Sequence, residues 1–240
     1  MCMMLFAGCG QTNTGADAAV QKEETTQADA TTGTQTDTKE SEGTQDALPA
    51  DSQNTGETAE PASGSTDVLV VYFSRTGEQY NVGVIDKGNT AIVAEIIAEE
   101  TGADTFEIVP QEDYYPYTYD ELTDIAKKEL NDNARPAYAG EVPDLSQYSI
   151  IFIGAPVWWG DWPMICYTFF EENAEGLSGK TLIPFSTHAG SGLSGFDSKL
   201  ASACPNSTVG TGLAIKGADT QNDLDSVKQS VNDWLAGLGY

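Results

Sequence analysis

The chain has 240 residues and a formal net charge of −26, from 37 acidic and 11 basic residues, with one histidine. Such a charge repels nucleic acid and anionic lipid, so neither is an expected partner, whereas a protein with a basic docking face is. Of the four cysteines, Cys2 and Cys9 lie in the opening segment, and the remaining two do not make a disulfide framework. Cys166 and Cys204 lie in apolar patterns that predict buried thiols.

The chain opens on a short apolar segment that ends in a cysteine. Residues 5–9 read Leu-Phe-Ala-Gly-Cys, which resembles the end of a bacterial lipoprotein signal, where small residues precede the acylated cysteine. The positive charges and most of the apolar core of such a signal are missing, so we interpret residues 1–9 as a truncated signal and expect the gene start to lie upstream. This interpretation makes Cys9 a lipidation site and the protein extracytoplasmic, anchored to the cell membrane. A short unstructured start is the alternative.

Residues 10–66 have the composition of a tether. They contain 11 acidic and 2 basic residues, no aromatic residue and few aliphatic side chains larger than alanine. Such a segment cannot bury enough apolar surface to offset its chain entropy, so it is predicted to be a disordered acidic linker rich in Thr and Gln. Residues 67–240 remain as one folded domain.

The domain begins with a strand, a turn and a helix. Residues 68–73 form an apolar run typical of a strand buried on both faces, and residues 91–98 have helical spacing that ends at Gly102. The turn carries three hydroxyls, on Ser74, Thr76 and Thr90. Because free amides and the positive end of the helix dipole converge there, the turn predicts a site for one phosphate group. Any strand-to-helix turn uses such residues, so an ordinary turn is the alternative.

Strands and helices then alternate. We expect strands at 104–109, 148–154, 180–185 and 208–215, and helices at 118–131, 162–173, 195–203 and 219–238. The last helix should bury Leu224, Val227, Val231, Trp234 and Leu235. A loop with four tyrosines, at 114, 115, 117 and 119, precedes the first of these helices. This order predicts an α/β fold, with right-handed crossovers and a parallel sheet covered on both faces.

Two further loops should lie beside the turn, because ligands bind beyond the carboxyl ends of parallel strands. The loop at 154–163 carries Trp158, Trp159 and Trp162, and an indole in a stiff loop stacks well on a flat ring. We expect Trp162 to belong to the core instead. The loop at 185–193 carries His188 and glycines that offer amides to a ligand. A lone histidine is more often structural than functional, and without a neighbouring ligand it forms no metal site.

These three loops resemble those of the flavodoxin-like family. The resemblance covers nearly all of 67–240 and rests on Ser74-Arg75-Thr76-Gly77 with Asn89-Thr90, on 154–160 and on 186–192. It implies a three-layer α/β/α sandwich with a five-stranded parallel sheet of order 2-1-3-4-5 that binds FMN non-covalently. The implied phosphate residues are Ser74, Thr76, Gly77, Asn89 and Thr90, and Arg75 of the same turn is also an implied cofactor-binding residue. The implied ring-binding residues are Pro156, Val157, Trp158, Trp159, Gly160, Thr187, His188, Ala189, Gly190 and Gly192.

One segment departs from the family pattern. The usual turn runs directly from Thr-Gly into the helix, whereas here residues 78–88 intervene. Either the phosphate site is rebuilt around them or it is lost. Gly88 and Asn89 at the helix start favour rebuilding, and the insertion would then form a flap over the ribityl chain or the ring.

The resemblance implies an electron-transfer protein that serves a redox partner. A second hypothesis is an FMN-dependent NAD(P)H oxidoreductase that acts on a quinone or a similar acceptor, although the sequence shows no basic cluster for a dinucleotide's phosphates. A third is a lipoprotein that binds another ligand and no flavin.

Overall fold

The computed structural model describes residues 67–112 and 114–240. The expectations for the signal at 1–9, for Cys9 and for the tether at 10–66 concern residues outside this range. In the described part of the chain, no helix combines the length and the apolar character needed to cross a bilayer.

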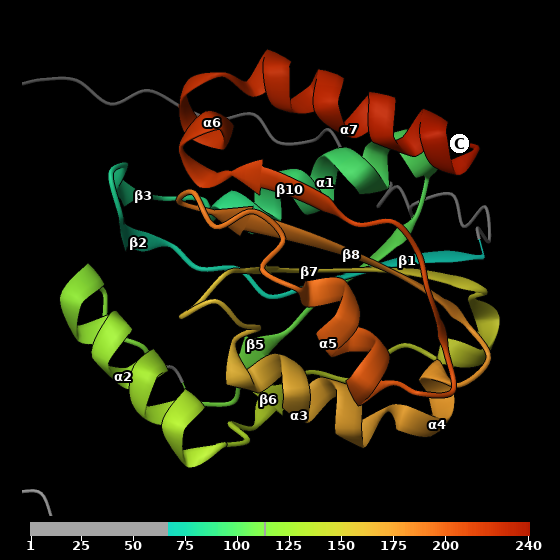
Figure 1. Ribbon diagram of the computed structural model, residues 1–240, viewed down its shortest axis with the longest axis horizontal. Coiled ribbons are helices and arrows are strands. Elements are labelled where there is room, and N and C mark those ends of the chain that lie inside the picture. The colour runs from blue at the N-terminus through green and yellow to red at the C-terminus, as the bar shows by residue number, and fades with distance from the viewer. Residues whose placement is uncertain (1–66, 113) are drawn as a thin grey trace, which may run out of the picture. The chain divides into compact units, whose positions relative to one another are not determined.

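The centre of the domain is a parallel sheet (Figure 1). Its main strands lie in the order β10-β8-β7-β1-β4, which are Leu213–Lys216, Thr181–His188, Ile150–Pro156, Val68–Tyr72 and Asp104–Glu107. In order along the chain this is 2-1-3-4-5, so the expected topology is confirmed. Strand β1 lies between β7 and β4, and in this register Val70 pairs with Phe152 of β7 and Thr105 of β4.

Helices cover both faces of the sheet (Figure 1). One layer contains α1 (Asn89–Thr101), α6 (Gly217–Asn222) and α7 (Leu224–Leu238). The other contains α2 (Tyr119–Asp132), α3 (Met164–Glu172), α4 (Ala174–Leu177) and α5 (Phe196–Ala203). Side chains of β1 alternate between the two cores: Val68 and Val70 pack toward α1 and α7, whereas Leu69 and Val71 pack toward α3 and α5.

Trp162 belongs to the core, as expected. It is 1% exposed, its ring stacks on Phe196 with centroids 3.7 Å apart, and its indole nitrogen donates to the Phe196 carbonyl at 3.2 Å. Cys166 and Cys204 are free buried thiols, and burial raises the pKa of both.

The expectation of one continuous fifth strand is wrong. The segment pairs with β8 in two pieces, β9 (Thr208–Val209) and β10, because Gly210-Thr211-Gly212 interrupts the pairing. A side chain at Gly212 would meet Leu193 at 2.7 Å and the Pro184 carbonyl at 2.9 Å, so the chain passes too close there for any larger residue.

The final helix is also divided, into α6 and α7. The Asp223 side chain accepts a hydrogen bond from the Ser226 N–H at 3.3 Å, so it caps the start of α7 and ends the preceding turn. Leu224, expected on the buried face, is 41% exposed because it lies in the first turn beside this cap, whereas Val227, Val231 and Leu235 are buried. Trp234 is half-buried, packs against Phe152, and donates its indole N–H to the Thr211 carbonyl.

The insertion at 78–88 folds into an antiparallel hairpin that the sequence did not predict. It consists of β2 (Gly77–Gln79) and β3 (Gly83–Ile85). A second small pair joins β5 (Val109–Pro110) to β6 (Tyr138–Ala139), and a 3-10 turn, η1 (Leu145–Gln147), leads into β7.

Candidate binding site

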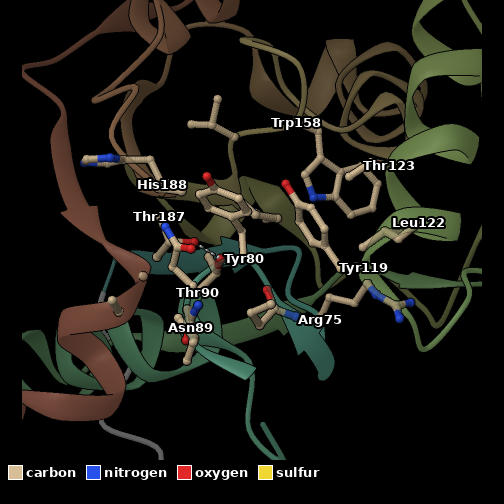
Figure 2. A pocket seen from close by; sticks show the side chains of 18 of the residues that line it. Arg75, Tyr80, Asn89, Thr90, Tyr119, Leu122, Thr123, Trp158, Thr187 and His188 are labelled. Carbon is tan, nitrogen blue, oxygen red and sulfur yellow. Dashed lines mark hydrogen bonds between the residues drawn. The ribbon is translucent and has the colours of Figure 1, made fainter. Parts of the chain in front are cut away.

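A cavity of about 460 Å³ lies at the carboxyl ends of the sheet strands, within the size range of small-molecule sites (Figure 2). It is lined by the turn after β1, the start of α1 and the loops after β7, β8 and β10. The β2–β3 hairpin and one face of α2 complete its wall.

Ten of the sixteen predicted site residues line this cavity: Arg75, Asn89, Thr90, Pro156, Val157, Trp158, Trp159, Thr187, His188 and Ala189. The other six do not line it: Ser74, Thr76, Gly77, Gly160, Gly190 and Gly192. The fold therefore brings the three predicted loops together. Several of their small residues determine the shape of the backbone and do not line the cavity.

The turn before α1 is rebuilt around the hairpin. After the excursion the chain returns at Gly88, where a Cβ would lie 2.2 Å from the Ser74 Oγ and 2.7 and 2.9 Å from the Arg75 carbonyl and amide atoms. The Ser74 Oγ accepts a hydrogen bond from the Ala91 N–H at 3.0 Å, which satisfies one of the free amides of the first turn of α1. Ser74 thus fixes the helix start, and this close approach requires glycine at 88.

The first two residues of α1 present polar groups to the cavity floor (Figure 2). The Thr90 hydroxyl hydrogen-bonds to the Thr187 hydroxyl at 2.7 Å, and both side chains are buried. The Asn89 Oδ1 accepts hydrogen bonds from Thr220 and Gln221, each at 2.9 Å, which leaves Nδ2 as the donor of that amide. With the positive end of the α1 dipole, these groups suit an anion.

Arg75 serves a different part of the site. Its guanidinium donates to the Tyr115 carbonyl at 2.9 Å and to the Pro116 carbonyl, and Figure 2 shows it directed away from Thr90. Its hydrogen bonds connect the turn after β1 to the tyrosine loop before α2. We therefore assign its charge to holding that loop.

The loop after β7 makes a tight turn that separates its tryptophans. Trp158 and Asp161 exchange backbone hydrogen bonds at 3.0 and 2.9 Å, and the two residues between them, Trp159 and Gly160, have φ values of 51° and 75°. Positive φ at both central positions is typical of a type I′ turn, and it is rare for a bulky residue. Trp159 is 52% exposed at the cavity rim, where its indole donates to the Thr123 carbonyl of α2 and Lys127 lies 4.5 Å from its ring centroid.

Trp158 forms a wall of the cavity (Figure 2). Its ring meets Phe73 and Tyr115 edge-on, each with centroids 5.3 Å apart. The Tyr115 hydroxyl donates to the Glu129 carboxylate at 3.2 Å, and the Tyr114 hydroxyl donates to the same group. Burial raises the pKa of this carboxyl, and the two phenols hydrogen-bond to its charged form. Trp158 is therefore held by a rigid aromatic support.

His188 lies at the edge of the cavity, with its imidazole directed away from Trp158 (Figure 2). Its Nδ1 accepts a hydrogen bond from the Gly190 N–H at 2.9 Å, which places the proton of the neutral ring on Nε2. Partial burial and the nearby Lys216 charge lower the pKa of His188. The neutral ring holds the 188–192 loop in shape, and the Ser186 hydroxyl does the same by donating to the Gly192 carbonyl at 3.1 Å.

Three groups of lining residues were not among the predicted site residues, although the insertion at 78–88 was expected to form a flap over the ribityl chain or the ring. These are Gln79, Tyr80, Asn81 and Val82 of the hairpin; Tyr119, Leu122, Thr123 and Ala126 of α2; and Lys216, Gly217 and Ala218 after β10. The hairpin had a signal, since Asn81 and Gly83 are turn formers between two short runs. The residues after β10 could also have been predicted, because that strand ends at the same edge of the sheet as the others.

The arrangement suits one class of ligand. Aromatic and apolar side chains form most of the wall, and the start of α1 collects hydroxyls and an amide at one end. Such a site matches a flat ring that carries a single anionic group. In the described residues, no cluster of three or more metal-binding side chains occurs.

Known proteins resemble this chain over most of its described residues. A family model described as flavodoxin matches residues 67–233. A candidate flavoprotein from Bacteroides uniformis is 30% identical with a TM-score of 0.54, covering 69% of this chain and 97% of its own. One from Bacteroides eggerthii is also 30% identical, with a TM-score of 0.51 and coverage of 67% and 96%.

A more distant structure has the same fold. The flavoprotein from Lactobacillus acidophilus, in complex with FMN, is 22% identical with a TM-score of 0.51, covering 66% of this chain and 97% of its own. No curated protein is significantly similar to this chain.

Proposed function

The chain belongs to the flavodoxin family, and from this premise we propose that it binds FMN non-covalently in the cavity and exchanges electrons with a protein partner. The observation that carries the proposal is the rebuilt turn. Although the hairpin interrupts the phosphate loop, Gly88 returns the start of α1 to Ser74 and Arg75, so the anion-binding end of the helix still faces the cavity.

The residues present fit the two ends of FMN. Asn89, Thr90 and the first amides of α1 would hold the phosphate, and Trp158 with Val157 would contact the ring. When bound, FMN supplies one- and two-electron exchange, and the protein supplies binding and electrostatics. The folded part contains 26 acidic and 9 basic residues. This charge makes it costlier to add electrons in the cavity, so we expect a low reduction potential.

Lys216 is expected to contribute to phosphate binding. It ends β10, lines the cavity, and precedes Gly217, where a Cβ would lie 2.6 Å from the Asn89 Nδ2. Replacing Lys216 by methionine should weaken FMN binding about tenfold and leave riboflavin binding unchanged, because an exposed charged donor contributes at the low end of about 1.5–3 kcal/mol. Fluorescence titration at two salt concentrations measures this, and the loss should shrink in high salt.

Lys228→Met is the matched control for this variant. Lys228 is an exposed lysine of α7 that does not line the cavity, so its loss changes the net charge equally. An equal loss of FMN affinity in the Lys228 variant, or an equal loss of riboflavin affinity in the Lys216 variant, would contradict a local role for Lys216.

The distribution of basic residues favours an electron carrier over an NAD(P)H oxidoreductase. Among the described residues that line the cavity, lysine and arginine occur only at Arg75 and Lys216, and Arg75 is bonded to the tyrosine loop. Lys216 is enough for the single phosphate of FMN. No other lysine or arginine in the described part of the lining is then left for the phosphates of a dinucleotide. The test is turnover of the FMN-loaded protein with NADPH and a soluble quinone. We expect none, and turnover at enzyme-like rates would favour the oxidoreductase.

We further propose that the domain is tethered outside the cell through a lipid on Cys9 and serves a partner with a basic docking face. The support is the sequence of residues 1–66 and the acidic charge of the domain. After bacterial expression behind a complete signal, mass spectrometry should find Cys9 acylated. An unmodified soluble product would contradict the anchor.

Deleting residues 1–66 should leave the melting temperature of the domain unchanged.

A further inference from the structure

The hairpin places an aromatic ring at the cavity. The three residues at its tip, Tyr80, Asn81 and Val82, all line the cavity, whereas Val84 on β3 does not. Figure 2 shows the Tyr80 ring projecting between Thr187 and His188 on one side and Tyr119 and Trp158 on the other. The tip therefore forms part of the site.

The hairpin is fixed at its base, so the position of Tyr80 is defined. The Glu78 N–H donates to the Tyr117 carbonyl at 2.9 Å, and the Glu78 carboxylate accepts the Tyr119 N–H, a free amide at the start of α2, at 2.9 Å. On β3, the Ile85 side chain is 7% exposed and belongs to the buried core of the domain. These contacts connect the hairpin to α2 and hold its tip over the cavity.

Tyr80 is held in place but not covered. Its ring lies 5.5 Å from that of Tyr119, at 36°, and the residue is 52% exposed. A large aromatic surface that faces a cavity and is half exposed gains burial when a flat ligand enters, and the face of an adjacent ring adds dispersion. The Tyr119 contact pre-orients the ring, which reduces the entropy lost on binding.

We propose that Tyr80 contacts the flavin ring, so that the inserted hairpin supplies a second aromatic wall in addition to Trp158 and slows release of the cofactor. This inference rests on the proposed function. It assigns the insertion a role in holding the ring, whereas Lys216, Asn89 and Thr90 act on the phosphate. Changes at Tyr80 should therefore alter FMN and riboflavin binding by the same factor.

The test is the rate of flavin release from the full-length protein, followed by the recovery of flavin fluorescence after dilution into a flavin scavenger. Tyr80→Ala should release FMN and riboflavin about tenfold faster, a factor near the upper end of the contribution of one aromatic pair. Tyr80→Trp should release both at the same rate or more slowly, which separates the ring's effect from damage to the fold. Val84→Ala, on the same hairpin and 60% exposed, should release both at the unchanged rate.

Three outcomes overturn this inference alone: unchanged release from Tyr80→Ala, faster release from Tyr80→Trp, or equal acceleration in Val84→Ala. A fourth, acceleration of FMN release without acceleration of riboflavin release, would assign Tyr80 to the phosphate and also overturn it. If the wild-type chain binds neither FMN nor riboflavin, the proposed function fails first and the inference fails with it.

Discussion

Replacing Gly88 by alanine should reduce FMN affinity roughly a hundredfold or more, the equivalent of two lost hydrogen bonds to a charged phosphate at about 1.5–3 kcal/mol each. The added Cβ would lie 2.2 Å from the Ser74 Oγ, which can rotate away, but also 2.7 and 2.9 Å from backbone atoms of Arg75, which cannot. The turn must therefore shift and carry the start of α1 away from the phosphate. Overpacking of this kind also lowers the free energy of unfolding, by about 1–3 kcal/mol.

Two comparisons isolate this effect. Riboflavin lacks the phosphate, so its affinity for Gly88→Ala should fall much less than that of FMN. Gly237→Ala in α7 is the control, because a Cβ there meets nothing and alanine favours the helix by up to about 1 kcal/mol. It should bind FMN normally and melt at the same temperature or higher. Normal FMN binding by Gly88→Ala would show that the turn is not the phosphate site.

The three neighbouring tryptophans should give three different phenotypes when each is replaced by alanine. Trp162→Ala should lower the free energy of unfolding by about 3–5 kcal/mol, because it removes a ring that is 1% exposed and stacked on Phe196. Trp158→Ala should instead weaken binding of oxidised FMN by roughly 1 kcal/mol or more and raise the reduction potential, because an electron-rich indole disfavours the reduced form. Trp159→Ala should lose only a rim contact with Lys127 and Thr123.

Chemical denaturation and potentiometric titration of the three variants separate these roles, with Trp159→Ala as the control for removing an indole from the same loop. If Trp158→Ala moves neither the potential nor the affinity, the ring is held in another way. If Trp159→Ala has the larger effect on the potential, the two tryptophans have been assigned in the wrong order.

The sequence predicted the architecture because its strongest patterns are those of the buried sheet. Residues 68–73 and 148–154 are apolar runs typical of a strand covered on both faces, and they form the neighbouring strands β1 and β7. The errors came where one side chain or close approach decides the outcome. Asp223 ends a helix by capping the next one, and Gly212 interrupts a strand against Pro184. Such tertiary contacts cannot be predicted from the periodicity of apolar residues along the chain.

The site was predictable to the extent that it follows the strand ends. Thr187 lies at the end of β8, Trp158 follows β7, and Asn89 begins α1, so the topology alone brings them together. Tyr119 and Leu122 lie on a helix between strands, and their approach to the cavity depends on how Glu78 and Arg75 connect that helix to the turn. Likewise, Ser74 was predicted to bind the phosphate through its hydroxyl, yet that hydroxyl accepts a hydrogen bond from the Ala91 N–H.

We propose that the full-length protein binds FMN through both the ring and the phosphate. The most direct measurement is titration of FMN with the apo-protein, following the quenching of flavin fluorescence, with riboflavin titrated in parallel. We expect saturable quenching at one site per chain, with FMN bound more tightly than riboflavin by roughly a hundredfold or more, the contribution of a bound phosphate. Absence of quenching, or riboflavin bound as tightly as FMN, would contradict it.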